Sequence, residues 1–291
     1  MSSISILPGL RSLAPNYQVL VCDIWGVIHN GRNAFDGVVD CLKAFRRDYG
    51  KVLLLSNAPR PSAPIRDQLQ SLGVPPDTYD TIVTSGDLTR KLLGERSKFG
   101  TYRIHHVGPE RDLTLFEGLD LARVAVDDAQ AIVCTGPFDD NTEGPDNYRD
   151  YWDLALDRKL PFLCANPDLQ VQRGDQMVYC AGALAEDYQR RGGDVTFLGK
   201  PHLPVYDFVA GRLKELTGAA IPRQRWLAIG DGLKTDILGA TRAGVDALLI
   251  TGGIHETELA DTSGAPDPVR IQSVLDEREL KALGAMRRLV W

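Results

Sequence analysis

The chain has 291 residues, of which 43% are apolar and 25% charged, and these ordinary values exclude the collagen, coiled-coil and disordered classes. Its 33 Lys and Arg residues against 39 Asp and Glu give a formal charge of −6, which argues against a nucleic-acid polymer or an anionic membrane as main partner. No apolar run approaches the roughly 18 residues that a membrane span needs, and the N-terminus does not resemble a signal sequence.

The cysteine pattern indicates a reducing compartment. There are five cysteines, none of them closely paired, so one would be left over in any disulfide scheme. Free thiols are typical of cytosolic proteins, and we therefore expect a cytoplasmic protein. The five residues are Cys22, Cys41, Cys134, Cys164 and Cys180.

Short apolar runs bounded by turn residues predict buried strands of a parallel sheet. In chain order these runs span residues 19–22, 52–55, 82–83, 132–134, 162–164, 195–198, 226–229 and 247–250. Helical patterns over 38–49, 65–72 and 205–216 lie between them, each followed by a glycine. Alternation of strand and helix implies right-handed crossovers, so the predicted fold is α/β with a doubly wound sheet. The middle, about 101–191, has its own strand and helix signals and is a candidate inserted domain.

Carboxylates follow two of the predicted strands. Asp23 comes directly after the run 19–22, where a carboxylate can attack phosphorus or bind a metal. Asp231 follows the run 226–229 and one glycine, and Asp236 falls near the first turn of the next helix. Because ligands bind outside the carboxyl ends of strands in open α/β sheets, we expect these side chains to serve one Mg²⁺.

Phosphate-binding groups follow two further strands. Ser56 and Asn57 come after the run 52–55, where a hydroxyl and backbone N–H groups can hold phosphate oxygens. Lys200 follows the run 195–198 and supplies a point charge suited to phosphate. Alone, each of these residues is most simply a turn or surface residue. Together with the carboxylates they supply the nucleophile, the metal ligands and the phosphate-binding groups that phosphoryl transfer needs.

The order of these strings resembles the haloacid dehalogenase superfamily, and specifically its subclass IIA of nitrophenylphosphatase and nucleotide or sugar phosphatase type. The similarity runs from about residue 17 to 253. Further strings that resemble the subclass are Thr84-Ser85-Gly86-Asp87, Ala165-Asn166-Pro167-Asp168, Gly182-Ala183-Leu184 and Gly199-Lys200-Pro201.

The resemblance implies a Rossmann-like core with an inserted α/β cap. The expected domains are a first part of the core at 1–99, the cap at 100–192 and a second part of the core at 193–291. Glycines tolerate large backbone changes, so we expect the cap to hinge near Gly100 and Gly192-Gly193.

The resemblance also implies a role for each site residue. Asp23 would be the nucleophile that becomes phosphoaspartate, and Lys200 would neutralise the nucleophile and the phosphate. Ser56 and Asn57 would contact phosphate. The implied Mg²⁺ ligands are Asp23, the backbone carbonyl of Trp25, Asp231 and Asp236. The implied function is a Mg²⁺-dependent phosphatase of a small phosphorylated metabolite.

One position departs from the family pattern. The family's phosphatases carry a second Asp two residues after the nucleophile, which protonates the leaving group and then activates water. Here this residue is Trp25, whose indole has neither a usable acid nor a base. His29, six positions after Asp23, is the nearest titratable substitute.

This departure leaves alternatives open. A phosphate-binding pseudoenzyme of the same fold would need no acid or base. A metal-free dehalogenase also lacks the second Asp but would leave Asp231 and Asp236 without a metal. A dinucleotide-binding enzyme is disfavoured because Thr235 occupies the third glycine position of its motif. The substrate is not apparent, and candidate cap contacts are Arg173, Asp187 and Tyr188. The remaining histidines, His105, His106, His202 and His255, lack the spacing of a zinc site.

Overall fold

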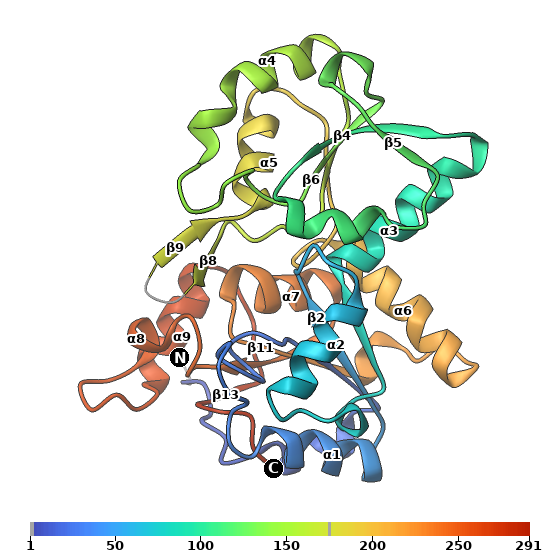
Figure 1. Ribbon diagram of the computed structural model, residues 1–291. Coiled ribbons are helices and arrows are strands. Elements are labelled where there is room, and N and C mark those ends of the chain that lie inside the picture. The colour runs from blue at the N-terminus through green and yellow to red at the C-terminus, as the bar shows by residue number, and fades with distance from the viewer. Residues whose placement is uncertain (1–2, 174–175) are drawn as a thin grey trace. The chain divides into compact units, whose positions relative to one another are not determined.

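The computed structural model describes residues 3–173 and 176–291 and contains two separate open sheets flanked by helices (Figure 1). The chain divides into two compact units. The first unit comprises Met1–Ser56, Ala63–Val83 and Tyr206–Trp291, and the second comprises Asn57–Ser62 and Thr84–Val205. The predicted doubly wound α/β class is confirmed. All five cysteines are buried, and none of them forms a disulfide. Within the described residues, no helix combines the length and apolar character that crossing a membrane requires.

The first unit is built on a six-stranded sheet in the order β13-β12-β11-β1-β2-β3. The strands are β1 (Val19–Cys22), β2 (Lys51–Ser56), β3 (Thr81–Thr84), β11 (Trp226–Gly230), β12 (Asp246–Ile250) and β13 (Gly284–Met286). Strand β1 is central and pairs in parallel with β2 and β11. The chain runs from β1 to β2 and β3 on one side and continues on the other side at β11, so the strand order reverses between β1 and β11.

Three helices of the first sheet cover the predicted helical patterns, namely α1 (Val38–Asp48), α2 (Ser62–Ser71) and α6 (Leu203–Thr217). The structure adds α7 (Leu238–Ala243), α8 (Glu256–Leu259) and α9 (Pro268–Glu277). In α1 the buried residues Val38, Cys41, Leu42 and Phe45 repeat at helical spacing, so one face packs into the core. Gly218 directly follows α6 with a φ of 76°, a left-handed conformation that glycine adopts without strain.

The second unit is built on a five-stranded sheet in the order β10-β7-β6-β4-β5. The strands are β4 (Tyr102–Val107), β5 (Leu121–Arg123), β6 (Ala131–Cys134), β7 (Phe162–Cys164) and β10 (Val195–Phe197), and every pairing is parallel. Strand β5 lies on one side of β4 and β6 on the other, so here the order reverses between β4 and β6. An antiparallel hairpin is formed by β8 (Gln170–Arg173) and β9 (Gln176–Tyr179).

The helices of the second unit are α3 (Ser85–Arg96), α4 (Arg149–Asp157) and α5 (Ala181–Arg190). Helices α4 and α5 border an aromatic core. Trp152 of α4 makes edge contacts with Phe162 of β7 and Tyr188 of α5, with ring centroids 5.6 and 5.5 Å apart. All three side chains are fully buried, so they join both helices to the sheet.

The second compact unit is wider than the expected cap of 100–192. Helix α3 begins with a capping box: the Thr84 hydroxyl accepts the Asp87 N–H at 2.9 Å, and the Asp87 carboxylate accepts the Thr84 N–H at 3.1 Å. A Cβ on Gly86 would lie 2.4 Å from the carbonyl oxygen of Pro59, so this glycine lets α3 pack on the segment Asn57–Ser62. Gly100 and Gly192 both lie inside the second unit, whose bounds therefore differ from those of the expected cap. That a cap begins and ends at these two glycines stays a prediction.

Candidate active site

Three carboxylates meet at the carboxyl edge of the first sheet. Cys22 of β1 is level with Ile229 of β11, so Asp23 and Asp231 follow neighbouring strand ends at the reversal of strand order. Ligand atoms of Asp23, Asp231 and Asp236 all lie within 4.8 Å of one another. Reversal points of open α/β sheets are where ligands bind. The structure thus brings together the three carboxylates that the sequence proposed.

Backbone N–H groups orient two of these carboxylates. The Ile254 N–H donates to Oδ2 of Asp231 at 2.8 Å, and the Gly232 N–H donates to Oδ2 of Asp236 at 3.0 Å. Asp236 lies in a π-helical turn, Leu233–Ile237, that leads into α7. The extra residue of such a turn is common at functional sites, and here it accompanies an inward-facing, buried carboxylate.

Glycines form the walls around Asp231. Gly26 has a φ of +82°, and a Cβ there would lie 2.1 Å from Oδ2 of Asp231. A Cβ on Gly253 would lie 1.9 Å from the same oxygen. Neither position tolerates a side chain without moving the carboxylate. Sequence reasoning did not identify these residues, because their contribution is the absence of a side chain.

The donor set fits a divalent metal. Three carboxylates offer hard oxygen atoms, which suit Mg²⁺ or Ca²⁺, and none of these ligand atoms is a sulfur or imidazole nitrogen that would favour zinc. Asp231 and Asp236 are buried and Asp23 is half-buried. A cation between the three carboxylates would reduce their mutual repulsion.

Trp25 lies in the loop that follows β1 and Asp23. Its indole meets the His29 ring edge-on, with centroids 5.3 Å apart, and Gly31 lies so close that a Cβ there would be 2.5 Å from the indole. The Trp25 residue is nevertheless 49% exposed. The loop after β1 therefore presents a partly exposed aromatic surface.

His29 is poorly suited to replace the missing base. It is buried, and burial lowers the pKa of its imidazole below the usual 6.5. Its Nδ1 accepts the Gly31 N–H at 3.0 Å, which places the proton of the neutral ring on Nε2. In this tautomer one nitrogen is protonated and the other is occupied, so neither offers a lone pair to a water molecule. The suggested acid–base role of His29 therefore finds no support.

The predicted phosphate-binding residues divide between the two units. Ser56 is the half-buried last residue of β2 in the first unit. In the second unit, Oδ1 of Asn57 accepts the Lys200 N–H at 2.8 Å, and Nδ2 of Asn57 donates to the Lys200 carbonyl at 3.0 Å and to Asp168 at 2.8 Å. Asn57 thus holds the backbone of Lys200, whose side chain is buried with 4% exposed.

Gly199 makes this arrangement possible. A Cβ on Gly199 would lie 2.5 Å from Oδ1 of Asn57 and 2.2 Å from the Ser85 hydroxyl. Three of the strings that resembled subclass IIA, those around Ser85, Asp168 and Lys200, therefore meet at Asn57. The Asn57 amide acts as a positioning group, and a contact to phosphate would come from its backbone N–H.

Two of the three candidate cap contacts have structural roles. Asp187 accepts hydrogen bonds from Arg190 at 3.1 Å and Arg191 at 2.9 Å. Tyr188 is fully buried and donates to the Leu160 carbonyl at 2.8 Å. Arg173 instead pairs with Asp140 and is half exposed. In the part of the chain that the structure describes, Asp23, Asp231 and Asp236 are the only group of three or more His, Cys, Asp or Glu residues placed to share a metal.

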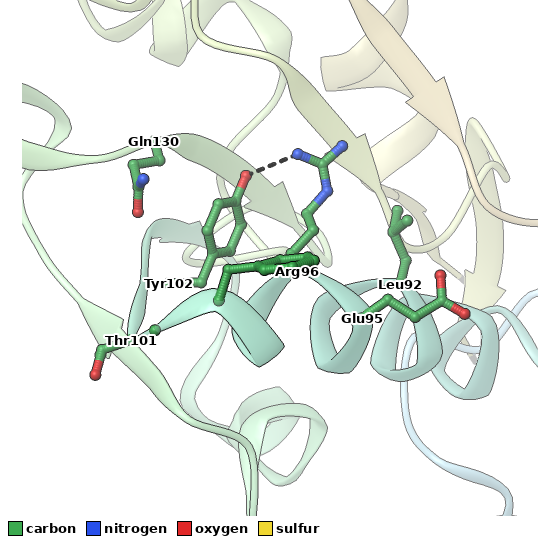
Figure 2. A pocket seen from close by; sticks show the side chains of 8 residues that line it. Leu92, Glu95, Arg96, Thr101, Tyr102 and Gln130 are labelled. Atoms are coloured by element: carbon green, nitrogen blue, oxygen red, sulfur yellow. Dashed lines mark hydrogen bonds between the residues drawn. The ribbon is translucent and has the colours of Figure 1, made fainter.

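A cavity of about 410 Å³ lies in the second unit, and none of the predicted site residues lines it (Figure 2). It is lined by the end of α3 and the start of β4, where the Arg96 guanidinium donates to the Tyr102 hydroxyl at 3.0 Å. This is the amino end of β4, opposite to the edge where ligands of α/β sheets bind. We therefore assign no function to it.

Family comparisons agree with this geometry. A haloacid dehalogenase-like hydrolase family model matches residues 20–122, and a HAD-hydrolase-like model matches residues 197–276. A hydrolase of the haloacid dehalogenase-like family from Brucella suis is 38% identical, with a TM-score of 0.82 over 98% of this chain and 100% of its own. The chain belongs to the haloacid dehalogenase-like hydrolase family. The resemblance stated from the sequence motifs is thereby confirmed.

More distant haloacid dehalogenase-like relatives carry phosphatase names. A D-glycerol 3-phosphate phosphatase from Mycobacterium tuberculosis is 27% identical over 84% of this chain, which spans 66% of that protein's length. A 4-nitrophenylphosphatase from Thermotoga maritima has a TM-score of 0.72 at 20% identity, over 95% of this chain and 96% of its own. A glycerol phosphate phosphatase structure from M. tuberculosis, in complex with magnesium, has a TM-score of 0.65 at 24% identity, over 93% and 75% of the chains.

Proposed function

We propose that this haloacid dehalogenase-like hydrolase is a divalent-metal-dependent phosphatase acting on a small phosphorylated metabolite, with Asp23 as nucleophile. The observation that carries the proposal is the meeting of Asp23, Asp231 and Asp236 within 4.8 Å at the reversal point of the first sheet. The phosphatase names of the relatives support the same reaction class.

The proposed reaction has two steps. A carboxylate oxygen of Asp23 attacks phosphorus, an oxygen–phosphorus bond forms, and the bond from phosphorus to the leaving alkoxide breaks. Water then attacks the phosphoaspartate, releases inorganic phosphate and restores the Asp23 carboxylate. Lys200, buried in the second unit and positioned through its backbone by Asn57, would offset negative charge on the phosphate.

The metal would be held by Asp23, the Trp25 carbonyl, Asp231 and Asp236. When bound, Mg²⁺ would supply a positive charge that stabilises phosphate oxygens in the transition state. Gly26 and Gly253 keep the Asp231 carboxylate in its place, and the Ile254 N–H sets its orientation. The magnesium complex of the M. tuberculosis glycerol phosphate phosphatase supports the choice of metal.

Trp25 defines which phosphate esters react well. Its indole cannot protonate a leaving alkoxide, and general acid–base groups typically contribute about 10²–10⁴-fold to rate. We propose that esters whose leaving group departs unprotonated, such as 4-nitrophenyl phosphate or an acyl phosphate, are hydrolysed more readily than alkyl esters. Binding without turnover, the pseudoenzyme alternative, draws its support from Trp25 alone, whereas the relatives favour turnover.

The direct test is hydrolysis of 4-nitrophenyl phosphate with Mg²⁺, with excess chelator, and with the variant Asp23→Asn. We expect activity only with metal, and a loss of about 10⁴-fold or more in the variant, the order seen when a nucleophile is removed. Asp77→Asn is a matched control, since Asp77 is an exposed carboxylate of the first unit paired with Lys43. Full activity of Asp23→Asn would refute the proposed mechanism.

A further inference from the structure

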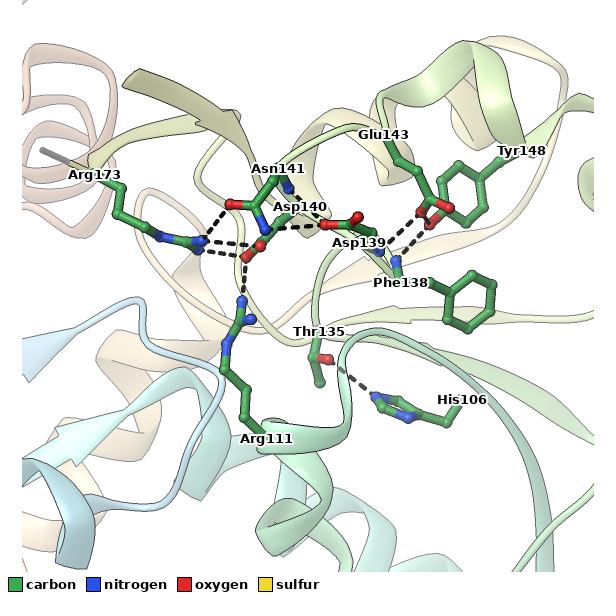
Figure 3. Close-up of polar contacts among 10 residues, drawn as sticks. All are labelled: His106, Arg111, Thr135, Phe138, Asp139, Asp140, Asn141, Glu143, Tyr148 and Arg173. Atoms are coloured by element: carbon green, nitrogen blue, oxygen red, sulfur yellow. Dashed lines mark hydrogen bonds and ion pairs between the residues drawn. The ribbon is translucent and has the colours of Figure 1, made fainter. Parts of the chain in front are cut away.

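A second polar centre lies within the second unit and is not part of the proposed phosphatase chemistry. Asp140 is buried, with 7% exposed, and two arginines converge on its carboxylate (Figure 3). Arg173 pairs with both oxygens, donating to Oδ1 at 2.9 Å, and Arg111 donates to Oδ2. The hydrogen bonds from both guanidiniums hold the pKa of Asp140 at about 2, well below its ordinary value.

Arg111 and Asp140 lie at the reversal point of the second sheet, and Arg173, the last residue of β8, contacts Asp140 from the hairpin. Arg111 belongs to the segment that follows β4, and Asp140 to the segment that follows β6, the two strands between which the order reverses. The two segments approach closely, since a Cβ on Gly108 would lie 1.9 Å from the Thr135 hydroxyl. A crevice outside the carboxyl ends of such strands is the usual ligand position in an open α/β sheet.

The guanidiniums keep donors available to a solute. Each arginine has five N–H donors, of which the pair with Asp140 uses only some. The side chains of Arg111 and Arg173 are 52% and 47% exposed, although the carboxylate between them is buried. One carboxylate shared by two guanidiniums leaves a net positive charge and fixes both planar groups before a ligand arrives.

Two nearby acids have partners of their own. Asp139 accepts hydrogen bonds from the Asn141 N–H and the Thr142 hydroxyl, and Glu143 accepts from the Tyr148 hydroxyl. These contacts fold the loop after β6 on itself. Asp112, next to Arg111 in the chain, is buried, and burial raises the pKa of its carboxyl.

We propose that this arginine pair is an oxyanion site in which Arg111 and Arg173, held by Asp140, bind a carboxylate or phosphate group. The group has two conceivable sources: a second anionic group of the phosphatase substrate, or a separate anion that binds to the second unit. Only the first source rests on the proposed phosphatase function.

The site itself is tested by binding, without turnover. Malonate and sulfate are titrated into the full-length protein while the Nε–H signals of labelled arginines are followed by NMR. We expect the signals of Arg111 and Arg173 to move, and affinity to fall about tenfold or more in Arg111→Met and in Arg173→Met, the order of a lost charged hydrogen bond. Each single variant leaves Asp140 one partner, so the buried carboxylate is not left without compensation.

Two variants guard against indirect effects. Arg149→Met removes an exposed arginine of the same unit that pairs with exposed Asp146, and it should leave anion binding unchanged. Arg111→Lys keeps the charge and a partner for Asp140 but removes the planar fork, and it should weaken binding less than Arg111→Met. Binding of both probes that is the same in wild type and in the two methionine variants, or no binding at all, would overturn the proposal.

Kinetics then separates the two sources. Glycerol 3-phosphate and 3-phosphoglycerate differ by a carboxylate in place of a hydroxymethyl group. If the substrate carries the second anion, the ratio of their kcat/KM values should favour 3-phosphoglycerate and fall about tenfold in Arg111→Met and Arg173→Met. An unchanged ratio with lost malonate binding assigns the site to a separate anion. An enzyme that is also inactive toward 4-nitrophenyl phosphate would refute the phosphatase proposal and leave the binding result standing.

Discussion

Both sheets of this chain gather charged side chains where the strand order reverses, but the charges have opposite signs. In the first sheet the order reverses between β1 and β11, and three carboxylates gather there. In the second it reverses between β4 and β6, and two guanidiniums gather around one carboxylate. The loops after the strands, and not the sheets, therefore decide whether such an edge attracts a cation or an anion.

The manner of support also differs between the two edges. Backbone N–H groups and glycines without side chains orient Asp231 and Asp236. Long arginine side chains build the second centre, and their charge is partly neutralised by Asp140. Carboxylates oriented by backbone groups suit a small multivalent cation, whereas long arginine side chains suit a larger oxyanion.

The largest difference between the carboxyl edges of the two sheets is expected when Asp231 is substituted. Asp231→Asn removes a charge from the cation site while keeping its shape, and we expect metal affinity to fall by more than about 100-fold, beyond the loss typical of an outer-shell change. Isothermal titration with Mg²⁺ and hydrolysis of 4-nitrophenyl phosphate should decline together. Malonate binding at the second sheet should not change. Undiminished hydrolysis in excess chelator would contradict the metal assignment.

The variant Trp25→Asp tests whether an acid–base group is the only group missing at the carboxyl edge of the first sheet. Restoring a carboxylic acid should raise turnover of alkyl phosphates by up to about 10²-fold, the lower end of a general acid–base contribution. In the wild type, phosphoaspartate should accumulate because water attack is slow, and rapid-quench mass spectrometry would detect the adduct on Asp23. Fast alkyl ester hydrolysis by the wild type without an adduct would show that another residue transfers the proton.

Matched glycine variants compare the two edges directly. Gly26→Ala would push a methyl group against Asp231, and Gly108→Ala would push one against Thr135; both positions have positive φ. We expect each variant to lose about 1–3 kcal/mol of unfolding free energy through steric strain. Only Gly26→Ala should also weaken Mg²⁺ binding. Equal losses of metal affinity in the two variants would mean that Gly26 has no special relation to the carboxylates.

The smallest expected effect concerns pH and the second sheet. Burial, with repulsion from Arg123 and His105, lowers the pKa of His106 to about 4, against about 6.5 in an unfolded chain. Between these values the unfolded chain binds more protons, so stability should decrease as pH falls from about 6.5 to 4. His106→Gln should show a smaller decrease in melting temperature over this range, at about 2–4 °C for each kcal/mol. Identical slopes would exclude His106 as a cause.

The sequence predicts strands best where burial on both faces makes them uniformly apolar. Strands β1, β6 and β11 were recognised for this reason. Strand β4 was not, because Arg103, His105 and His106 interrupt its apolar residues, and the His105 Nδ1 finds a partner only in the tertiary structure, 2.9 Å from the Val124 carbonyl. The hairpin β8–β9 exposes Met177 and Tyr179 and has no buried pattern to recognise.

The two centres differ in predictability for a similar reason. Asp23 and Asp231 could be proposed because each follows an apolar run, and parallel strands bring their ends together. Arg111, Asp140 and Arg173 follow no such rule: 29 residues separate the first two and 33 the last two, and no motif marks them. The need for glycine at position 26 could not be predicted from the sequence, because it arises only from the close approach of the Asp231 carboxylate in the folded chain.

The position of β1 has a consequence for synthesis of the protein. Its two neighbours are β2, which follows soon after it, and β11, which begins at Trp226. At 5–20 residues per second, roughly 10–40 s pass before the ribosome delivers that second neighbour. The second sheet, contained within residues 102–197, is completed earlier. In stalled nascent chains truncated before β11, protease should spare the second sheet and cut near β1. The central strand β1 thus waits longer for its second neighbour than any other strand of this sheet, and its apolar edge stays unpaired until β11 is made.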